Sequence, residues 1–428
     1  MRDDETPPQT PTGTLSPATP ATPRTDVPAP SAGPAPWLLR LVVVGLVLTA
    51  LNLRPAITSL GALLEEVRDG LHMSGSVAGV LTSVPPLCFA VFGIMAPRLA
   101  RRFGAGAVVC AGMVAITAGL LIRPLIGGTA GFLAASALAL MGIAVSNVLM
   151  PVIVKRWFPD RVGSMTGLYS MALALGTSLA AAVTVPMTEA MGGSWKAGLG
   201  IWAVLAAAAI LPWIPLVRDR SGAPGQPSAR RAQAPELRIT RSRTAWALAC
   251  FFGLQATAAY ITMGWMPQIF RDAGVSAGTA GVLLAVTMAM GVPLAFVIPR
   301  VAARMRNQGA IVVFLGACGL VGYAGLYLAP SGGAWAWALL LGISNCAFPL
   351  ALTMIGMRSR SGAGVVRLSA FAQSTGYLIS IPGPLLVGVL YQHSGGWGLP
   401  IALMAALMVP QMAAGILAGR DRTIEDEC

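Results

Sequence analysis

The chain is 428 residues long, and 55% of its residues are hydrophobic while only 11% are charged. A soluble globular domain carries about 25% charged residues, so this composition, with a mean hydropathy of +0.72, excludes an ordinary soluble protein. The net charge of +13 does not indicate nucleic-acid binding either, because the basic residues lie in short loops between apolar segments, as in membrane proteins.

Apolar segments of about 20 residues recur along the chain, and each is long enough to cross a bilayer as an α-helix. They predict an all-α membrane protein with twelve transmembrane helices. The segments cover about 37–61, 76–97, 106–124, 130–154, 163–186, 198–217, 245–268, 278–299, 309–329, 334–356, 366–390 and 397–419.

The first segment of the chain, 1–36, is rich in proline, threonine and alanine and has no apolar run. This predicts a disordered tail rather than a signal peptide. Most lysines and arginines would lie on the same side of the membrane as this tail, so the positive-inside rule places both termini in the cytoplasm. We therefore expect a multi-pass protein of the cytoplasmic membrane whose basic loops meet the lipid bilayer, with no nucleic-acid partner.

The first apolar segment contains an arginine, in the string Asn52-Leu53-Arg54-Pro55. At about 1.5 Å per residue, Arg54 lies roughly 20 Å beyond Leu41 and roughly 16 Å before Glu65, near the middle of the bilayer. None of the apolar segments contains an acidic residue that could pair with it. An unpaired charge in hydrocarbon is costly, so Arg54 is a candidate ligand for an anionic substrate. The alternative is an arginine that reaches the headgroups or bonds to backbone carbonyls.

The next features along the chain are polar or basic. The second apolar segment ends in Gly93-Ile94-Met95-Ala96-Pro97-Arg98-Leu99-Ala100-Arg101-Arg102, and the fourth carries Asn147. The stretch 218–243, rich in arginine, glycine, proline and serine, predicts a flexible basic cytoplasmic linker. It divides the chain into a six-helix bundle at 37–217 and a second one at 244–419, which is followed by a cytoplasmic tail at 420–428.

The two halves of the chain repeat one another. Ala78-Gly79-Val80-Leu81 recurs as Ala280-Gly281-Val282-Leu283, and Pro97-Arg98-Leu99-Ala100 recurs as Pro299-Arg300-Val301-Ala302. Farther along, Asn147-Val148-Leu149-Met150-Pro151 is matched by Asn345-Cys346-Ala347-Phe348-Pro349. Three matches in the same order indicate a duplicated unit, the symmetry expected of transporters whose site lies between two halves.

Further polar residues occur at similar depth in the second half. They are Gln255 and Tyr260 in the seventh segment, Asn345 in the tenth, and Gln373 and Tyr377 in the eleventh. Gln373 and Tyr377 stand four residues apart and so share one helix face. Each residue alone is compatible with an interhelical hydrogen bond, but together with Arg54 and Asn147 they favour a polar cavity at the middle of the membrane.

Several prolines lie in or beside the same stretches: Pro55, Pro151, Pro349, Pro382 and Pro384. Proline removes a backbone hydrogen bond and kinks a helix, so these positions predict bends. Such bends serve a rocking carrier, although inert membrane helices contain them too.

The string from Gly93 to Arg102 resembles the signature between the second and third helices of the major facilitator superfamily. This chain carries Pro97 where that family usually has aspartate, and Ala100 where it usually has glycine. The resemblance implies a fold of two pseudo-symmetric six-helix bundles. It also implies a gating role for a set of residues at equivalent places of the two halves: Gly93, Arg98, Arg101, Arg102, Pro299 and Arg300.

Two further strings resemble the branch of that superfamily that contains cyanate and 2-nitroimidazole carriers. They are Asn52-Leu53-Arg54-Pro55-Ala56-Ile57-Thr58-Ser59 and Ala372-Gln373-Ser374-Thr375-Gly376-Tyr377-Leu378, together with Gln255 and Tyr260. The resemblance implies transport of a small molecule without naming it. The expected substrate-binding residues are Arg54, Asn147, Gln255, Tyr260, Asn345, Gln373 and Tyr377.

Enzyme chemistry finds no support in the sequence. The two histidines, His72 and His393, lie in short outer loops, and the cysteines lack metal-ligand spacing. Neither a nucleophile motif nor a Walker-type phosphate loop stands out. We therefore expect no catalytic residue, no metal and no cofactor, in a protein that acts as a monomer.

Together these features predict a secondary active or facilitative transporter that moves a small anionic or polar, cyanate-like solute by alternating access. One alternative is an exporter of nitroimidazole-like or other drug-like compounds, in which Arg54 meets a nitro group. An alternative of another class is a membrane receptor or scaffold without transport. Because the apolar segments contain no carboxylate and no histidine, we predict no dedicated proton site at the middle of the membrane.

Overall fold

The computed structural model describes residues 36–217 and 238–427. The regular structure within these two ranges is helical, and no strand occurs in them. The predicted disordered tail, apart from its last residue, and most of the predicted linker at 218–243 lie outside the described residues.

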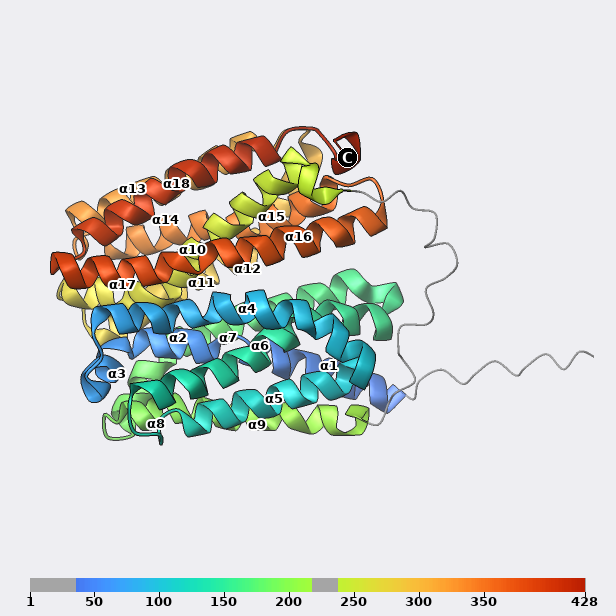
Figure 1. The fold of residues 1–428 in the computed structure, drawn as a ribbon. Coiled ribbons are helices and arrows are strands. Elements are labelled where there is room, and N and C mark those ends of the chain that lie inside the picture. The colour runs from blue at the N-terminus through green and yellow to red at the C-terminus, as the bar shows by residue number, and fades with distance from the viewer. Residues whose placement is uncertain (1–35, 218–237, 428) are drawn as a thin grey trace, which may run out of the picture.

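The first half of the chain forms one helical bundle, drawn in blue to green in Figure 1. Its elements are α1 (Pro36–Asn52), α2 (Pro55–Ala62), α3 (Leu64–Leu71), α4 (Gly75–Phe103), α5 (Ala105–Ile122), α6 (Thr129–Trp157), η1 (Pro159–Arg161), α7 (Val162–Ala190), α8 (Trp195–Gly200), α9 (Trp202–Ile210) and η2 (Leu211–Val217).

The second half forms another bundle beside it, drawn in yellow to red. Its elements are η4 (Ile239–Arg241), α10 (Arg243–Asp272), α11 (Ala277–Ala289), α12 (Gly291–Arg304), α13 (Gly309–Leu328), α14 (Ala334–Asn345), α15 (Ala347–Met357), α16 (Gly362–Ser380), α17 (Pro382–Ser394), α18 (Gly398–Ala418) and η5 (Ile424–Asp426).

Twelve helical units in the described residues are long and apolar enough to cross a membrane, so the predicted number of transmembrane helices is confirmed. Several units combine consecutive elements: α1 with α2, α8 with α9 and η2, α11 with α12, α14 with α15, and α16 with α17. Large apolar side chains such as Val204 and Phe314 stay exposed on the outside, as a surface that faces lipid requires.

Prolines account for two of the interrupted spans. The first span breaks at Arg54, immediately before Pro55, and the eleventh breaks immediately before Pro382. Proline lacks the N–H that would bond to the carbonyl four residues earlier, so the helix loses a hydrogen bond there. Pro151 behaves differently, because α6 runs through it without a break.

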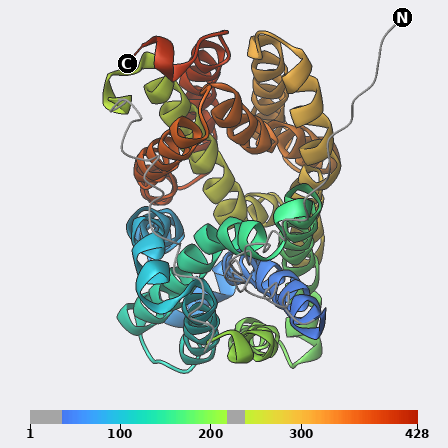
Figure 2. The same cartoon turned by 90° about the vertical axis from the view of Figure 1, so that its right-hand side faces the viewer.

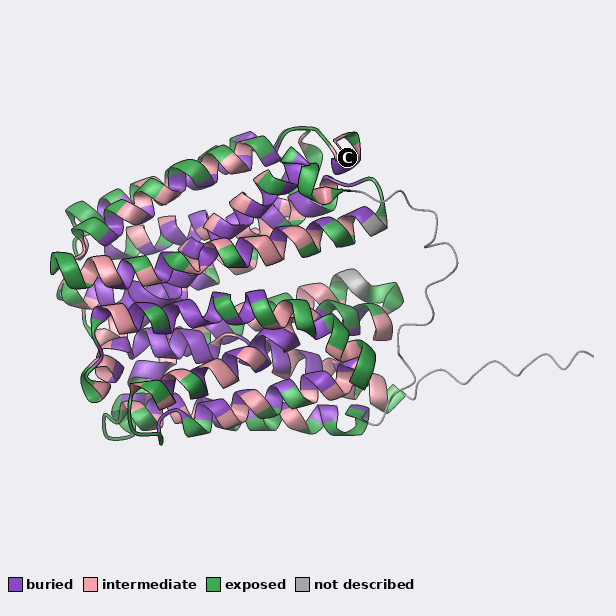
Figure 3. Cartoon of the chain, viewed as in Figure 1, coloured by how far each residue is buried: buried purple, intermediate pink, exposed green. Residues whose placement is uncertain are grey.

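We call the end of the molecule where α1 begins and α18 ends the termini side, and the opposite end the far side. The bundles contact one another through α4 against α17 and α7 against α11. Figure 2 looks onto the termini side and shows the helices of the two bundles grouped around a shared centre. Figure 3 shows that buried residues concentrate where the bundles meet toward the far side.

Two glycines allow this close approach. A Cβ atom on Gly79 of α4 would lie 2.8 Å from the carbonyl oxygen of Leu385 in α17, and one on Gly281 of α11 would lie 2.6 Å from that of Ala181 in α7. Real Cβ atoms do not approach carbonyl oxygens so closely, so glycine is needed at both positions. Gly79 and Gly281 are the equivalent glycines of the repeated Ala-Gly-Val-Leu strings, which gives the duplication a structural role.

Polar groups also join the two halves on the far side. Nη2 of Arg271, at the end of α10, lies 2.9 Å from Oε2 of Glu65, and its Nη1 lies 2.9 Å from Oε1 of Glu66 in α3. Ser76 Oγ donates a hydrogen bond to Gln392 Oε1 at 2.6 Å. These contacts, with the glycine interfaces, close the molecule on the far side.

Candidate substrate site

A cavity of about 530 Å³ lies between the two bundles. Its walls come from Arg54, at the break between α1 and α2, and from α7 in the first half, and from α10, α11, α12, α14, α15 and α16 in the second. The cavity extends from Arg54 and Tyr260 toward the termini side, as far as Gly167 near the start of α7 and Pro299 near the end of α12. A cavity of this size with mostly apolar walls and a few polar groups is typical of a small-molecule site.

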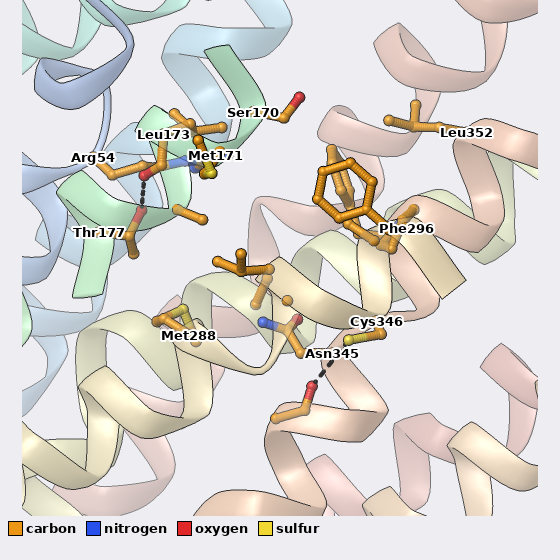
Figure 4. A pocket seen from close by; sticks show the side chains of 18 of the residues that line it. Arg54, Ser170, Met171, Leu173, Thr177, Met288, Phe296, Asn345, Cys346 and Leu352 are labelled. Atoms are coloured by element: carbon orange, nitrogen blue, oxygen red, sulfur yellow. Dashed lines mark hydrogen bonds between the residues drawn. The ribbon is translucent and has the colours of Figure 1, made fainter. Parts of the chain in front are cut away.

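Arg54 is the single charged residue among the described residues that line the cavity. It occupies the break between α1 and α2, where its carbonyl oxygen accepts hydrogen bonds from the N–H groups of Ile57 and Thr58 at 2.9 and 3.1 Å. Figure 4 shows its side chain beside Leu173 and Met171 of α7. Within the described ranges, Arg54 forms no salt bridge with an acidic residue.

A cluster of three aromatic rings lies beside the Arg54 guanidinium. Its Cζ atom lies 5.9 Å from the ring centre of Phe89 in α4. Phe89 stacks on Tyr377 of α16 with ring centres 5.1 Å apart, and it tilts against Tyr260 of α10 at 6.4 Å. Both tyrosines line the cavity and interact electrostatically with Arg54. Their hydroxyl groups are therefore placed to donate hydrogen bonds to a solute held by the cation.

Asn345 lines the cavity at the end of α14 and is fixed from behind by Gln255 of α10. Gln255 Nε2 donates to the backbone carbonyl of Asn345 at 2.9 Å and to its Oδ1 at 2.7 Å. This carbonyl is free to accept because Pro349, four residues farther on, has no N–H. Gln411 of α18 in turn donates to Gln255 Oε1 at 3.3 Å. With Oδ1 engaged, Asn345 keeps its Nδ2 group as a donor for the cavity.

Three of the expected binding residues do not line this cavity. Gln255 is 1% exposed and acts through Asn345, while Gln373 Nε2 donates to Ser369 Oγ of its own helix at 2.7 Å. Asn147 is half-buried in α6. Of the two equivalent asparagines of the repeat, Asn345 therefore lines this cavity and Asn147 does not. The two backbones differ, because α14 ends at Asn345 whereas α6 continues through Asn147.

The residues of the family signature lie on helices rather than in a loop. They occupy the last turns of α4 and of α12: Gly93, Arg98, Arg101, Arg102, Pro299 and Arg300. The chain turns only at Gly104, whose φ of 87° suits glycine. Pro299 is the one member of this set that lines the cavity, and the arginines are exposed on the termini side.

Two buried polar residues were not expected from the sequence. Arg123 follows α5 at the outer end of the predicted segment 106–124, and its side chain turns into the bundle, where it is 1% exposed. Its direction depends on packing, and no sequence pattern indicates it. Gln411 is a lone amide in the last apolar segment, directly after Pro410, and that isolation is the signal that could have identified it.

Comparison with known proteins identifies related transporters. Residues 42–363 match the sequence profile of the Major Facilitator Superfamily. An uncharacterized transporter of Bacillus subtilis (strain 168), YycB, is 37% identical over 390 residues, covering 91% of this chain and 94% of the relative. The 2-nitroimidazole transporter of Escherichia coli (strain K12) is 32% identical over 392 residues, covering 90% and 96%. The cyanate transport protein CynX of Escherichia coli (strain K12) is 30% identical over 368 residues, covering 86% and 94%.

Solved structures resemble the fold at lower sequence identity. The nucleoside transporter NupG superposes with a TM-score of 0.71 at 13% identity, covering 89% of this chain and 98% of NupG. A D-xylose–proton symporter superposes with a TM-score of 0.65 at 13% identity, covering 91% and 98%. At this level of identity the likeness concerns the fold alone, and it confirms the predicted two-bundle architecture.

Proposed function

This chain belongs to the major facilitator superfamily, and we propose that it carries a small anionic or polar solute, cyanate-like in size and charge, by alternating access. As a member of the family it is a multi-pass membrane transporter of small solutes and not an enzyme. A receptor or scaffold without transport is therefore set aside.

The observation that carries the proposal is the charge of Arg54. Its guanidinium is the one charged group on the described lining of the cavity, and that lining contains no Asp or Glu. A cation in a cavity with mostly apolar walls is unfavourable unless an opposite charge joins it. An anion therefore gains free energy on entering, whereas a neutral solute gains only from hydrogen bonds.

The neighbours of Arg54 supply orientation. A guanidinium binds planar or linear anions through paired N–H donors, and Tyr260 and Tyr377 of the second half offer hydroxyl groups on the lining of the same cavity. Asn345 offers its Nδ2 group from the second half, with Gln255 as a positioning residue behind it. A solute bound by these groups contacts both bundles at once.

The arrangement of the halves supports one state of a transport cycle. Contacts of Arg271 with Glu65 and Glu66 close the far side, and the cavity extends toward the termini side. With both termini in the cytoplasm of the cytoplasmic membrane, as the positive-inside pattern favours, this state faces inward. Export and import both need the far-side contacts to part and the termini side to close.

A nitroimidazole-like exporter remains the second candidate, favoured by the size of the cavity. A volume of about 530 Å³ exceeds what a triatomic anion fills, and the 2-nitroimidazole transporter is 32% identical. In this case the nitro oxygens would meet Arg54, and the ring would lie against Phe296 and Tyr260, which both line the cavity.

Coupling to a proton inside the cavity is not part of the proposal. The described lining contains no Asp, Glu or His, and Glu65 and Glu66 pair with Arg271 outside it. We therefore propose a facilitator, an exchanger or a carrier of the protonated solute. Substrate-driven proton uptake in proteoliposomes, with a solute that does not titrate near neutral pH, should be absent, and stoichiometric uptake would contradict this point.

Uptake of labelled cyanate and of 2-nitroimidazole into proteoliposomes tests the function. We expect saturable cyanate uptake by the wild type, a loss of at least about tenfold in Arg54→Gln, and no loss in Arg40→Gln. Arg40 is the matched control, because it lies in α1 of the same span but is exposed. Saturable uptake of 2-nitroimidazole without uptake of cyanate would replace the first candidate with the second.

A further inference from the structure

A second cation is buried in the first half, close to the central cavity but outside its lining. Arg123 is 1% exposed, and its Nη1 donates to the carbonyl oxygen of Ala56 in α2 at 3.1 Å. Its Nε and Nη2 atoms are buried and have no hydrogen-bond partner among the described residues. Ala56 lies two residues after Arg54, so Arg123 contacts the same broken span from behind.

A small cavity lies in front of this guanidinium. Its lining includes Arg123 and Ser136 of the first half and Tyr260 of the second. The free volume is about 20 Å³, room for one group of roughly the size of a water molecule. Tyr260 lines this cavity and the central one, so the two are neighbours that share one side chain.

The donors around this small cavity point to the charge of its ligand. A buried guanidinium has five N–H donors and no acceptor, and Arg123 forms no ion pair with an acidic residue of the described ranges. Ser136 Oγ is also buried without a partner in these ranges. Leaving such donors and a full positive charge unpaired in the membrane is costly, and a neutral ligand would relieve only part of that cost.

We propose that Arg123 and Ser136 form a second anion site, which takes a halide or one end of a linear pseudohalide. The guanidinium supplies the charge and two N–H donors, and the Ser136 hydroxyl supplies a third hydrogen bond. Since the site adjoins Tyr260, an anion that leaves Arg54 toward the far side reaches Arg123 next. This role in transit rests on the proposed function, whereas binding at Arg123 does not.

Thermal unfolding of the purified full-length chain tests the site, with bromide exchanged for gluconate at constant ionic strength. The measurements use an Arg54→Gln background, so that bromide at Arg54 does not contribute. We expect a saturable rise in Tm with bromide that persists when Arg40→Gln is added and disappears when Arg123→Gln is added. Ser136→Ala should raise the half-saturating bromide concentration about 10-fold or more, the effect of one hydrogen bond to a charged group.

An undiminished bromide effect in the Arg123→Gln variant, or no saturable effect in the Arg54→Gln background, would overturn the proposal. If the Arg123→Gln variant does not fold, the Ser136→Ala variant provides the test. A half-saturating bromide concentration that Ser136→Ala leaves unchanged would also overturn the proposal. The result is independent of the transport assay, because Arg54→Gln can keep its bromide response whether or not it abolishes cyanate uptake.

Discussion

The two halves of the protein share a duplicated helical plan and differ in their polar chemistry. In the first half, two arginines line the central and the small cavity, Arg54 and Arg123, and neither has an acidic partner in the described part of the chain. The second half holds neutral amides, in which Gln411 donates to Gln255 and Gln255 donates to Asn345. The duplicated plan sets the packing. In the proposed function, the groups that attract the anion lie in one half and those that orient it lie mainly in the other.

This division has a consequence for the transport cycle. A solute that contacts Arg54 in the first half and Asn345 or Tyr377 in the second joins the two bundles across the cavity. Binding therefore favours states in which the halves approach, which is the requirement for closing the termini side around the solute. A cation in one half alone, without donors in the other, would bind the anion but would not link binding to the movement.

The largest effect is expected from removing the charge of the first half. Arg54→Ala should lower uptake by about 10- to 100-fold, because a hydrogen bond to a charged group contributes about 1.5–3 kcal/mol. Tm should stay unchanged or rise, since the variant removes an unpaired charge from the membrane interior. Arg54→Lys should recover only part of the uptake, because an ammonium lacks the planar fork of a guanidinium. Uptake at the parental rate in Arg54→Ala would contradict the assignment.

A second prediction tests the shared packing. Gly281→Ala places a Cβ 2.6 Å from the Ala181 carbonyl oxygen, so we expect a loss of about 1–3 kcal/mol in the free energy of unfolding. Gly278→Ala is the matched control, because it lies in the same helix and its Cβ would meet no atom within 4 Å. The control should be neutral or slightly stabilising. Equal Tm values for the two variants would show that α7 and α11 are not in close contact.

A third prediction tests the amides of the second half. Gln255→Met removes the donor to the Asn345 carbonyl and Oδ1, so we expect a loss of about 1–2 kcal/mol and weaker solute binding. Pro349→Ala restores an N–H that can bond to the same carbonyl. The double variant should therefore be more stable than Gln255→Met alone in thermal unfolding. Strict additivity of the two changes would indicate that Pro349 does not free this carbonyl.

Much of the fold could be predicted because its causes are local. Twelve apolar segments, a repeated Ala-Gly-Val-Leu string and a basic cluster at the end of the second span all lie within short windows of sequence. The depth of Arg54 in the membrane followed from the helix rise per residue alone, and the structure places Arg54 on the cavity wall. Such a depth can be estimated by counting residues along the span.

The rest of the site depends on rotation about helix axes, which sequence does not give. Asn147 and Asn345 occupy equivalent places in the repeat, yet only Asn345 lines the cavity, since its span breaks after it and Gln255 holds it. Arg123 stands at a helix end, where its side chain is free to turn outward or inward. Its inward direction depends on the carbonyl of Ala56, which lies far away in sequence.

The C-terminal tail provides the smallest effect, and it concerns the second half alone. Glu427 Oε2 accepts hydrogen bonds from Ser242 Oγ at 2.7 Å and from the Thr244 N–H at 2.9 Å, at the start of α10. Glu425 Oε1 accepts one from Ser359 Oγ at 2.6 Å. Burial acts to raise the pKa of Glu427, but these hydrogen bonds outweigh it and hold the pKa below its usual value.

A carboxyl group whose pKa is lowered by folding stabilises the folded state above its unfolded pKa of about 4.3, and this stability is lost as the pH falls through the folded pKa. Glu427→Gln should therefore lower Tm slightly at pH 7, by an amount that corresponds to at most about 1 kcal/mol, because the group lies near the surface and is only partly buried. The difference from wild type should shrink as the pH falls below about 4.3 and through the lowered folded pKa, beneath which both chains carry an uncharged group. Thermal unfolding from pH 7 to the lowest pH at which both proteins stay folded measures it. A difference that persists undiminished in acid would show that the stabilisation by Glu427 does not depend on its carboxylate charge.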